Sequence, residues 1–451
     1  MTASSFSNGK RAILFSILFL VLIANSNHAF AQDPLRVWNT FLGSADDDFC
    51  VENTVAVDTS GNIYVAGESR ASWGTPVSGN SGGDDAFVAK LSSDGVLLWN
   101  TFLGGTDEDE GYGIYVDDSG NIYVTGESES SDWGVAPVNA HNGDAQDDIF
   151  VAKLDGSGTL IWHTFLGSSY RDLGDGITLD GAGNIYVSGR SEATWGTAPK
   201  RAYTGGTDVF VAKLNSSGAR QWNTFMGSVS YDSGSEIAVD GSGFVYVAGF
   251  SDAAWGAPLN AHAGNADILV AQLNSNGDLQ WHTFLGSSDA DRCYGLDLDA
   301  SDNLYITGNS FANWWTPIVP YTGNNIFAAK LNSSGGVLWN TFMGSSANNN
   351  SGHHIFATGS GEVFVTGRSE GTWGEPIYPY VGGSETLLTK LNTDGQYQWH
   401  TFMGSGAYDE GNGIVLDASG HAYIAGLSDA TWGAPIRAFA GGNDVSIAKV
   451  R

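Results

Sequence analysis

Two sets of side chains in this sequence could take part in binding. The first is a set of tryptophans that recur, one per repeat, in segments rich in Gly and Pro: Trp73, Trp133, Trp195, Trp255, Trp314, Trp373 and Trp432. An indole beside Asn, Asp and Gly could stack on the face of a sugar ring. The competing interpretation is that each indole folds its own loop onto the protein. Recurrence at one position of every repeat favours this structural role.

The second set is acidic, and six of its members are candidate metal ligands. They lie in short Asp- and Glu-containing segments that follow a recurring Thr-Phe-Leu-Gly tag: Asp46, Asp48, Asp107, Asp109, Asp289 and Asp291. Calcium takes roughly six to eight oxygen ligands, so calcium is the cofactor that this pattern would suit. No segment has a ligand at every second position, as calcium-binding loops do. We therefore expect a solvated acidic rim and no bound cofactor.

The remaining reactive residues do not form a recognisable catalytic arrangement. His163, His282 and His400 each follow a tryptophan in alternate repeats, so they cannot share a metal ion. No Ser-His-Asp order stands out, and the scattered acids define no pair of carboxylates around a glycosidic bond. We expect no catalytic residues and therefore no enzyme.

The elements that would position these side chains come from an internal repeat of about sixty residues. A Trp-(Asn/His)-Thr-Phe-(Leu/Met)-Gly tag begins at seven places: Trp38, Trp99, Trp162, Trp222, Trp281, Trp339 and Trp399. Each repeat holds four short segments rich in β-branched and aromatic residues, bounded by Gly, Asn, Asp and Ser. The first and third links are tight, with Gly at a turn position, whereas the other links are longer. This pattern predicts four antiparallel strands per repeat, which we call A to D.

Four antiparallel strands per repeat are the unit of a propeller blade, so we predict an all-β, seven-bladed β-propeller. The chain begins with a strand D alone, at residues 35–42, and ends with strands A, B and C alone. These ends should combine into the seventh blade, which would close the ring. The longer B–C and D–A links should lie on one face, and variable loops on a rigid scaffold usually carry recognition.

The repeat resembles the bacterial SBBP β-propeller repeat. The resemblance rests on Asp-x-Phe-Val-Ala-Lys-Leu, as at 208–214, on the Trp-x-Thr-Phe-Leu-Gly tag, and on the Gly-Ile-x-x-Asp-x-x-Gly-Asn-Ile-Tyr-Val-x-Gly pattern, as at 113–126. It implies a propeller fold and supplies no catalytic motif. Local departures are Thr358 and Glu362 in a turn, Phe244 in another turn, and Trp315 in place of a loop glycine.

The N-terminal segment indicates export. Lys10 and Arg11 precede an apolar run, and Ala29-Phe30-Ala31 provides small residues for cleavage before Gln32. This predicts a signal peptide over 1–31, a single propeller domain over 32–451, no membrane span, and a secreted, periplasmic or cell-surface location. The net charge of −30 disfavours nucleic acid as a partner. We expect a monomer.

Three functional hypotheses remain open at this point. The favoured one is an interaction or scaffold module whose long-loop face binds a protein or a cell-surface polysaccharide. The second is a carbohydrate-binding, lectin-like propeller, with or without calcium. The third is a hydrolase with its site at the mouth of the central channel.

Overall fold

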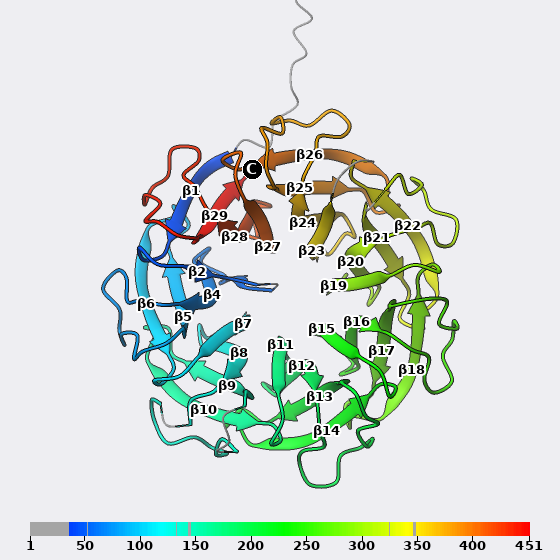
Figure 1. Cartoon of the computed structure of the whole chain (residues 1–451), viewed down its shortest axis with the longest axis horizontal. Coiled ribbons are helices and arrows are strands. Elements are labelled where there is room, and N and C mark those ends of the chain that lie inside the picture. The colour runs from blue at the N-terminus through cyan, green and yellow to red at the C-terminus, as the bar shows by residue number, and fades with distance from the viewer. Residues whose placement is uncertain (1–35, 52, 132, 143–145, 324, 346–348) are drawn as a thin grey trace, which may run out of the picture. The chain divides into compact units, whose positions relative to one another are not determined.

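The computed structural model describes residues 36–51, 53–131, 133–142, 146–323, 325–345 and 349–451. All of them belong to one compact unit, Pro34–Arg451. They form seven separate antiparallel sheets arranged in a ring, which confirms the predicted all-β, seven-bladed propeller (Figure 1). The described part of the chain contains no helix with the length and apolarity needed to span a bilayer. The predicted signal peptide, residues 1–31, lies outside the described residues.

The blades follow one another in chain order. Blade 1 consists of β2 (Asp48–Phe49), β3 (Val55–Val57), β4 (Ile63–Ser69), β5 (Asp85–Leu91) and β6 (Leu97–Leu103). Blade 2 consists of β7 (Asp109–Val116), β8 (Ile122–Ser128), β9 (Asp148–Leu154) and β10 (Leu160–Leu166). Blade 3 consists of β11 (Asp172–Leu179), β12 (Ile185–Ser191), β13 (Asp208–Leu214) and β14 (Arg220–Met226). Blade 4 consists of β15 (Asp232–Val239), β16 (Val245–Ser251), β17 (Asp267–Leu273) and β18 (Leu279–Leu285).

The last three blades repeat this order. Blade 5 consists of β19 (Asp291–Leu298), β20 (Leu304–Ser310), β21 (Asn325–Leu331) and β22 (Val337–Met343). Blade 6 consists of β23 (Asn350–Ala357), β24 (Val363–Ser369), β25 (Glu385–Leu391) and β26 (Tyr397–Met403). Blade 7 consists of β27 (Asp409–Leu416), β28 (Ala422–Ser428), β29 (Asp444–Val450) and β1 (Arg36–Leu42). In blade 1, β2 and β3 both pair with β4, so together they take the place of one inner strand.

The two ends of the propeller meet in blade 7, as the sequence predicts. β1 pairs antiparallel with β29, in a register that joins Trp38 to Lys449 and Leu42 to Val445. The same register shift next to the tryptophan occurs between strands C and D of the other blades, for example at Leu160/Trp162. The β1–β29 pair is therefore the C–D hairpin of an ordinary blade without its turn.

The tight A–B turns explain why the repeat carries Asp, Gly and Asn at fixed positions. The Asp117 carboxylate accepts hydrogen bonds from the backbone N–H of Ser119 and of Asn121, each at 2.9 Å. It also accepts one at 2.7 Å from the Asn121 side chain. Gly120 lies between them with φ of 79°, a conformation that suits glycine. The side chains thus fix the turn, and the turn fixes the A–B register.

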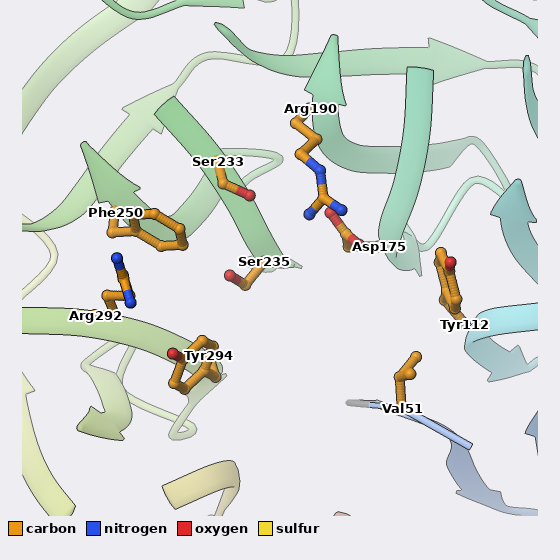
Figure 2. Close-up of a pocket in the computed structure, with 9 residues that line it drawn as sticks. All are labelled: Val51, Tyr112, Asp175, Arg190, Ser233, Ser235, Phe250, Arg292 and Tyr294. Carbon is orange, nitrogen blue, oxygen red and sulfur yellow. The ribbon is translucent and has the colours of Figure 1, made fainter. Parts of the chain in front are cut away.

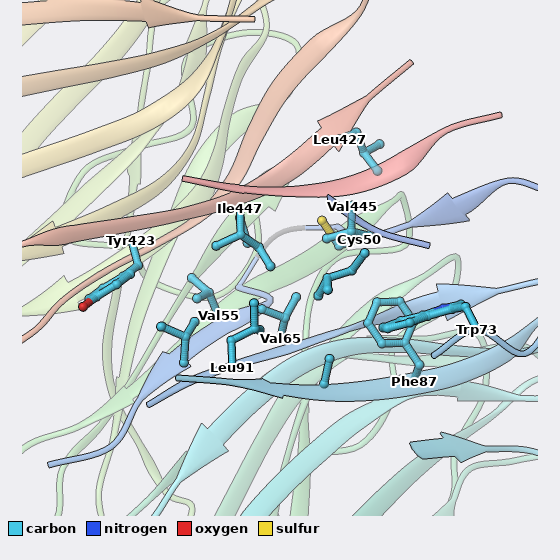
Figure 3. Packing of buried hydrophobic residues seen from close by; sticks show 14 of the residues in the cluster. Cys50, Val55, Val65, Trp73, Phe87, Leu91, Tyr423, Leu427, Val445 and Ile447 are labelled. Carbon is cyan, nitrogen blue, oxygen red and sulfur yellow. The ribbon is translucent and has the colours of Figure 1, made fainter. Parts of the chain in front are cut away.

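Apolar cores form where neighbouring blades meet. One cluster joins Val65 and Phe87 of blade 1 to Tyr423 and Ile447 of blade 7 (Figure 3). Strand D tryptophans add a contact at the outer part of each interface. The Nε1 of Trp99 donates a 3.2 Å hydrogen bond to the backbone oxygen of Gly156 in the next blade. These tryptophans therefore help to dock each blade onto the next.

Candidate functional site

The loop tryptophans point into the blades. Trp373 is half-buried and the other six are buried. In blades 2, 4 and 6 the indole stacks on the histidine of strand D, as for Trp255 on His282, with ring centroids 3.9 Å apart. Elsewhere an asparagine replaces that histidine, and its side chain binds the tryptophan backbone, as Asn100 Nδ2 does at 2.9 Å from Trp73 O. The buried rings therefore present no face to a sugar.

Truncation of one loop tryptophan should act on stability. Trp195 packs edge-on against Phe210 and Phe225, with centroids 5.4 and 5.6 Å away. Trp195→Ala removes this buried ring, so the free energy of unfolding should fall by about 3–5 kcal/mol in a urea titration. Unchanged stability would contradict a structural role for these tryptophans.

The acidic candidates separate into two environments. Asp46, Asp107 and Asp289 are exposed in the D–A links. Asp48, Asp109 and Asp291 are buried at the first position of an inner strand, where their carboxylates accept hydrogen bonds from serines and backbone N–H groups, as Asp109 does from Ser128 and Gly105. The structure does not bring the exposed and buried members together. The described residues contain no group of three or more His, Cys, Asp or Glu placed to hold a metal ion.

The buried members have a different partner, which lies across the blade interface. In the neighbouring blade, strand C begins with a second acid, so that Asp85 faces Asp109 across Gly104. A Cβ at Gly104 would lie 2.6 Å from Asp109 Oδ2 and 2.8 Å from Asp85 Oδ1, so only glycine fits there. Burial raises the pKa of Asp85 to about 7, and the charge of Asp109 adds to this effect. One interface differs, because Asn325 and Asn350 stand where the others have acids.

Side chains that differ between blades gather at the channel mouth, the end of the ring where inner strands begin and second strands end. A cavity of about 270 Å³, the arginine pocket, opens there (Figure 2). Blades 1 to 5 supply its lining: Val51, Tyr112, Asp175, Arg190, Ser233, Ser235, Phe250, Arg292 and Tyr294. Antiparallel pairing explains the grouping, because Asp291 opposes Ser310 and so brings the start of strand A beside the end of strand B.

The two arginines of this pocket have different surroundings. The carboxylate of Asp175 lies beside the guanidinium of Arg190 (Figure 2). Burial lowers the pKa of Arg190, but the charge of Asp175 and smaller contributions from Tyr231, Glu127 and Tyr112 together more than offset that and raise it. Arg292 instead lies over the ring of Phe250, 5.0 Å from its centroid. It forms no ion pair or hydrogen bond through its guanidinium with any described residue, and its Nε is buried.

Carboxyl groups flank the arginine pocket on its blade 2 side. The hydroxyl of Tyr112 is hydrogen-bonded to Glu110 and Glu127, and Glu110 in turn shares a hydrogen bond with Glu68. We call Glu68, Glu110 and Glu127 the acidic flank. Burial and mutual repulsion raise the pKa of Glu68 well above its usual range. The mouth is therefore bipolar, with guanidinium groups on blades 3 and 5 and carboxyl groups on blades 1 and 2.

Deeper in the channel, polar side chains from three blades meet across the axis. Asn53 Nδ2 of blade 1 donates a 2.9 Å hydrogen bond to Glu236 Oε1 of blade 4. His354 Nε2 of blade 6 lies 3.7 Å from Glu236 Oε2. These contacts cross the channel, so groups that enter from the mouth meet a polar barrier.

The B–C loop of blade 5 differs from the other six B–C loops because it has large apolar residues at three positions where they mostly have glycine or polar residues. Trp315 is 54% exposed and has φ of 54°, where the other six loops have glycines with φ from 53° to 76°. Phe311 is 40% exposed, where the other blades have Arg, Asp or Glu. Val319 is also exposed, at a position that is mostly polar elsewhere. Three apolar substitutions thus expose large side chains in one loop of the blade that carries Arg292.

The sequence indicated the face on which this cavity lies but not the residues that line it. The arginine pocket combines single positions from five blades, and no single segment contains its pattern. The available signal was variation within the repeat: the residue before the last serine of strand B is Glu, Glu, Arg, Phe, Asn, Arg and Leu in blades 1 to 7.

Residues 99–132 match the family model of the SBBP β-propeller repeat, which confirms the predicted resemblance for that segment. In sequence, the chain is 28% identical over 179 residues to the regulatory protein FlaEY of Caulobacter vibrioides, covering 38% of this chain and 18% of that protein. It is 21% identical over 282 residues to the uncharacterized WD repeat-containing protein L264 of Acanthamoeba polyphaga mimivirus, covering 52% of this chain and 20% of that protein. The chain thus spans about a fifth of these relatives.

Among solved structures, the WD40 domain of Neurospora crassa Pan2 is similar, at 10% identity and a TM-score of 0.42. The similarity covers 88% of this chain and 89% of that one. Sqt1 from Chaetomium thermophilum is also 10% identical, with a TM-score of 0.43, covering 87% of this chain and 81% of that one.

Proposed function

We propose that this protein is an exported interaction module that binds a protein partner with its channel mouth and the B–C loop of blade 5. A propeller with homologues that carry SBBP or WD repeats is consistent with an interaction scaffold. Blade-to-blade repetition accounts for the cores, the turns and the loop tryptophans. A binding role therefore falls to the residues that differ between blades, and they concentrate at these two places.

Trp315 carries this proposal. A non-glycine residue in the left-handed region costs about 1–3 kcal/mol, and such residues cluster at functional sites. Six blades avoid that cost with glycine, whereas blade 5 accepts it and places an indole half in solvent. Exposed tryptophan is a frequent energetic centre of protein interfaces. Phe311 and Val319 extend the apolar character of the same loop, as protein-binding surfaces commonly require.

Trp315→Gly tests this function without the risk of unfolding the protein. Because it restores the residue of the other six loops, the variant should be as stable as the parent or about 1 kcal/mol more stable. We expect it to lose the partner that the parent captures from surface and secreted extracts of the source cells, measured by pull-down and mass spectrometry. Leu98→Ser, at a 52% exposed apolar position on strand D of blade 1, is the matched control and should retain that partner.

Equal capture by the parent and by Trp315→Gly would contradict this function. A polysaccharide array probed with the parent provides the second arm. Specific binding that survives Trp315→Gly would favour the carbohydrate hypothesis instead.

A further inference from the structure

We propose that the arginine pocket binds the carboxylate of a single Asp or Glu side chain from a protein partner, held by Arg292. This inference rests on the proposed function and identifies the chemistry that the channel mouth recognises. It draws on three features: an arginine with no counter-ion among the described residues, a cavity of restricted size, and carboxyl groups that flank it.

Arg292 is the unsatisfied charge of the pocket. Asp175 lies beside Arg190, so that pair is close to neutral, whereas no described carboxylate lies within ion-pair distance of Arg292 (Figure 2). Its Nε is buried and has no hydrogen-bond partner among the described residues. A planar guanidinium matches a carboxylate with two parallel hydrogen bonds, and Phe250 underneath holds that plane in place.

The size of the cavity favours a side chain over a free metabolite. At about 270 Å³ the pocket is smaller than the roughly 300–1,000 Å³ typical of sites for drug-sized ligands. The hydroxyl-bearing Ser233 and Tyr294 line the same cavity and provide polar neighbours for a carboxylate. One acidic side chain on a loop of the partner can enter this space, which leaves room for water around it.

The acidic flank restricts which anions can enter. Tyr112 lines the arginine pocket and is hydrogen-bonded to Glu110 and Glu127, so these carboxyl groups lie one side chain away. A second cavity, lined by Glu68 and Glu410, shares Val51 with the arginine pocket. Glu127 is ion-paired with Arg171 at 3.0 Å. The raised pKa of Glu68 keeps that carboxyl protonated near pH 7, which leaves Glu110 as the member of the flank without an ion pair to a described residue. A phosphate group carries about −1.5 to −2 charges and would meet stronger repulsion from Glu110 than a carboxylate with one charge. The mouth should therefore select a carboxylate over a phosphorylated residue.

Short peptides test this selection on the whole protein. The probes are acetylated and amidated Gly-Ser-X-Ser-Gly peptides, with X as Glu, Gln or phosphoserine, and an acetylated Gln peptide with a free C-terminal carboxylate. Binding is measured by isothermal titration and ligand-observed NMR. We expect the Glu peptide to bind at least about fivefold more tightly than the other three. Arg292→Gln should abolish this preference, and Arg292→Lys should retain part of it. Arg451→Gln, at an exposed position outside the pocket, is the control and should keep it.

Each other outcome would overturn the inference. Equal binding of the Glu and Gln peptides would exclude carboxylate recognition, as would a Glu preference that survives Arg292→Gln. Tighter binding of the phosphoserine peptide would exclude the proposed selection, and tighter binding of the free C-terminus would exclude a side chain as the occupant. If any of these results accompanies partner capture that depends on Trp315, the proposed function stands and only this inference fails. If peptide selection is found but Trp315→Gly captures the partner normally, the proposed function fails instead.

Discussion

Deletion of β1, residues 36–42, is expected to abolish cooperative unfolding of the whole propeller. This strand supplies Phe41 and Leu42, both fully buried, and pairs with β29 along its length. Losing one buried phenylalanine costs about 3–5 kcal/mol, and a domain has only about 5–15 kcal/mol of stability in total. The deletion also exposes the edge of β29 to pairing with other chains. Circular dichroism melting should show a broad transition or aggregation in place of a sharp one.

A circular permutant provides the matched control for this deletion. Residue 451 is joined to residue 36 through Ser-Ser-Gly-Ala, so that five residues separate the paired Val450 and Arg36, as five separate Leu214 and Arg220 in blade 3. The new ends are placed in the A–B turn near Ser242. Because the β1–β29 pairing is kept and made covalent, the permutant should melt at the parent's temperature or above it. A second control, deletion of residues 1–31, should leave the transition unchanged. A sharp parental transition in the β1 deletion would contradict the role of this strand in closing the ring.

The fold was predictable because local and long-range signals agree in every repeat. The Asp117-to-Asn121 turn, the alternation of strand B and the Trp-x-Thr-Phe tag each recur seven times, with few departures such as Phe244 and Thr358. The division of blade 7 between the chain ends followed from counting strands. What the repeat could not show is how far each tryptophan is buried, because an indole that stacks on His282 and one that is open to solvent have the same spacing.

The channel mouth was not predictable at the level of residues. Arg292, Phe250 and Asp175 belong to three blades, and only the curvature of the ring brings them to one cavity. The buried carboxyl pairs were missed for the same reason. Asp85 and Asp109 are 24 positions apart, at the starts of a strand C and a strand A, and only the close packing of adjacent blades makes them face each other across Gly104.

These carboxyl pairs lead to a second large effect, on the pH dependence of stability. Burial raises the pKa of Asp85 and Asp172 to about 7, and that of Asp48, Asp208, Asp267 and Asp444 to about 6, from a usual value near 4. A carboxyl whose pKa is higher in the folded protein binds more protons there than in the unfolded chain. Its stabilising contribution is therefore complete below about pH 4 and is lost as the pH rises towards 7.

Other titratable groups oppose this trend but are fewer. Burial lowers the pKa of His163 and His400 to about 4, so their effect on stability has the reverse sign between about pH 4 and 6.5. Hydrogen bonds lower the pKa of Asp58 and of the equivalent turn acids despite their partial burial. The stability that these acids contribute is present above about pH 4 and is lost only below it. We therefore expect the free energy of unfolding to be greatest near pH 4 and to fall by several kcal/mol towards pH 8, measured by urea titration in EDTA.

The asparagine pair at the interface of blades 5 and 6 indicates how to remove this pH dependence. Asn325 Oδ1 accepts the 2.7 Å hydrogen bond from the N–H of Thr322, as Asp85 Oδ2 accepts one from Ser81. Asp85→Asn should therefore keep that bond and direct an amide N–H towards Asp109. At pH 8 the variant should be about 1–3 kcal/mol more stable than the parent, since it removes a buried carboxylate and its repulsion with Asp109. Near pH 4, where the parent pair holds a proton in the folded state and Asp85 has only begun to ionise in the unfolded chain, the two proteins should be equally stable.

The reverse exchange, from asparagines to acids, should increase the pH dependence of stability. Asn325→Asp combined with Asn350→Asp installs an additional carboxyl pair, so the loss of stability of this variant between pH 5 and pH 8 should exceed that of the parent.

Millimolar calcium in place of EDTA distinguishes a carboxyl pair that shares a proton from one that binds a cation. If calcium abolished the loss of stability above pH 6 in the parent, the pairs would be cation sites. If Asp85→Asn were destabilised equally at both pH values, repulsion between Asp85 and Asp109 would not be the cause. If each pair shares a proton, the loss of unfolding free energy as the pH rises should be smaller than the parent's in Asp85→Asn and larger in the variant with Asn325→Asp and Asn350→Asp. For each protein, this loss should be the same in EDTA and in calcium.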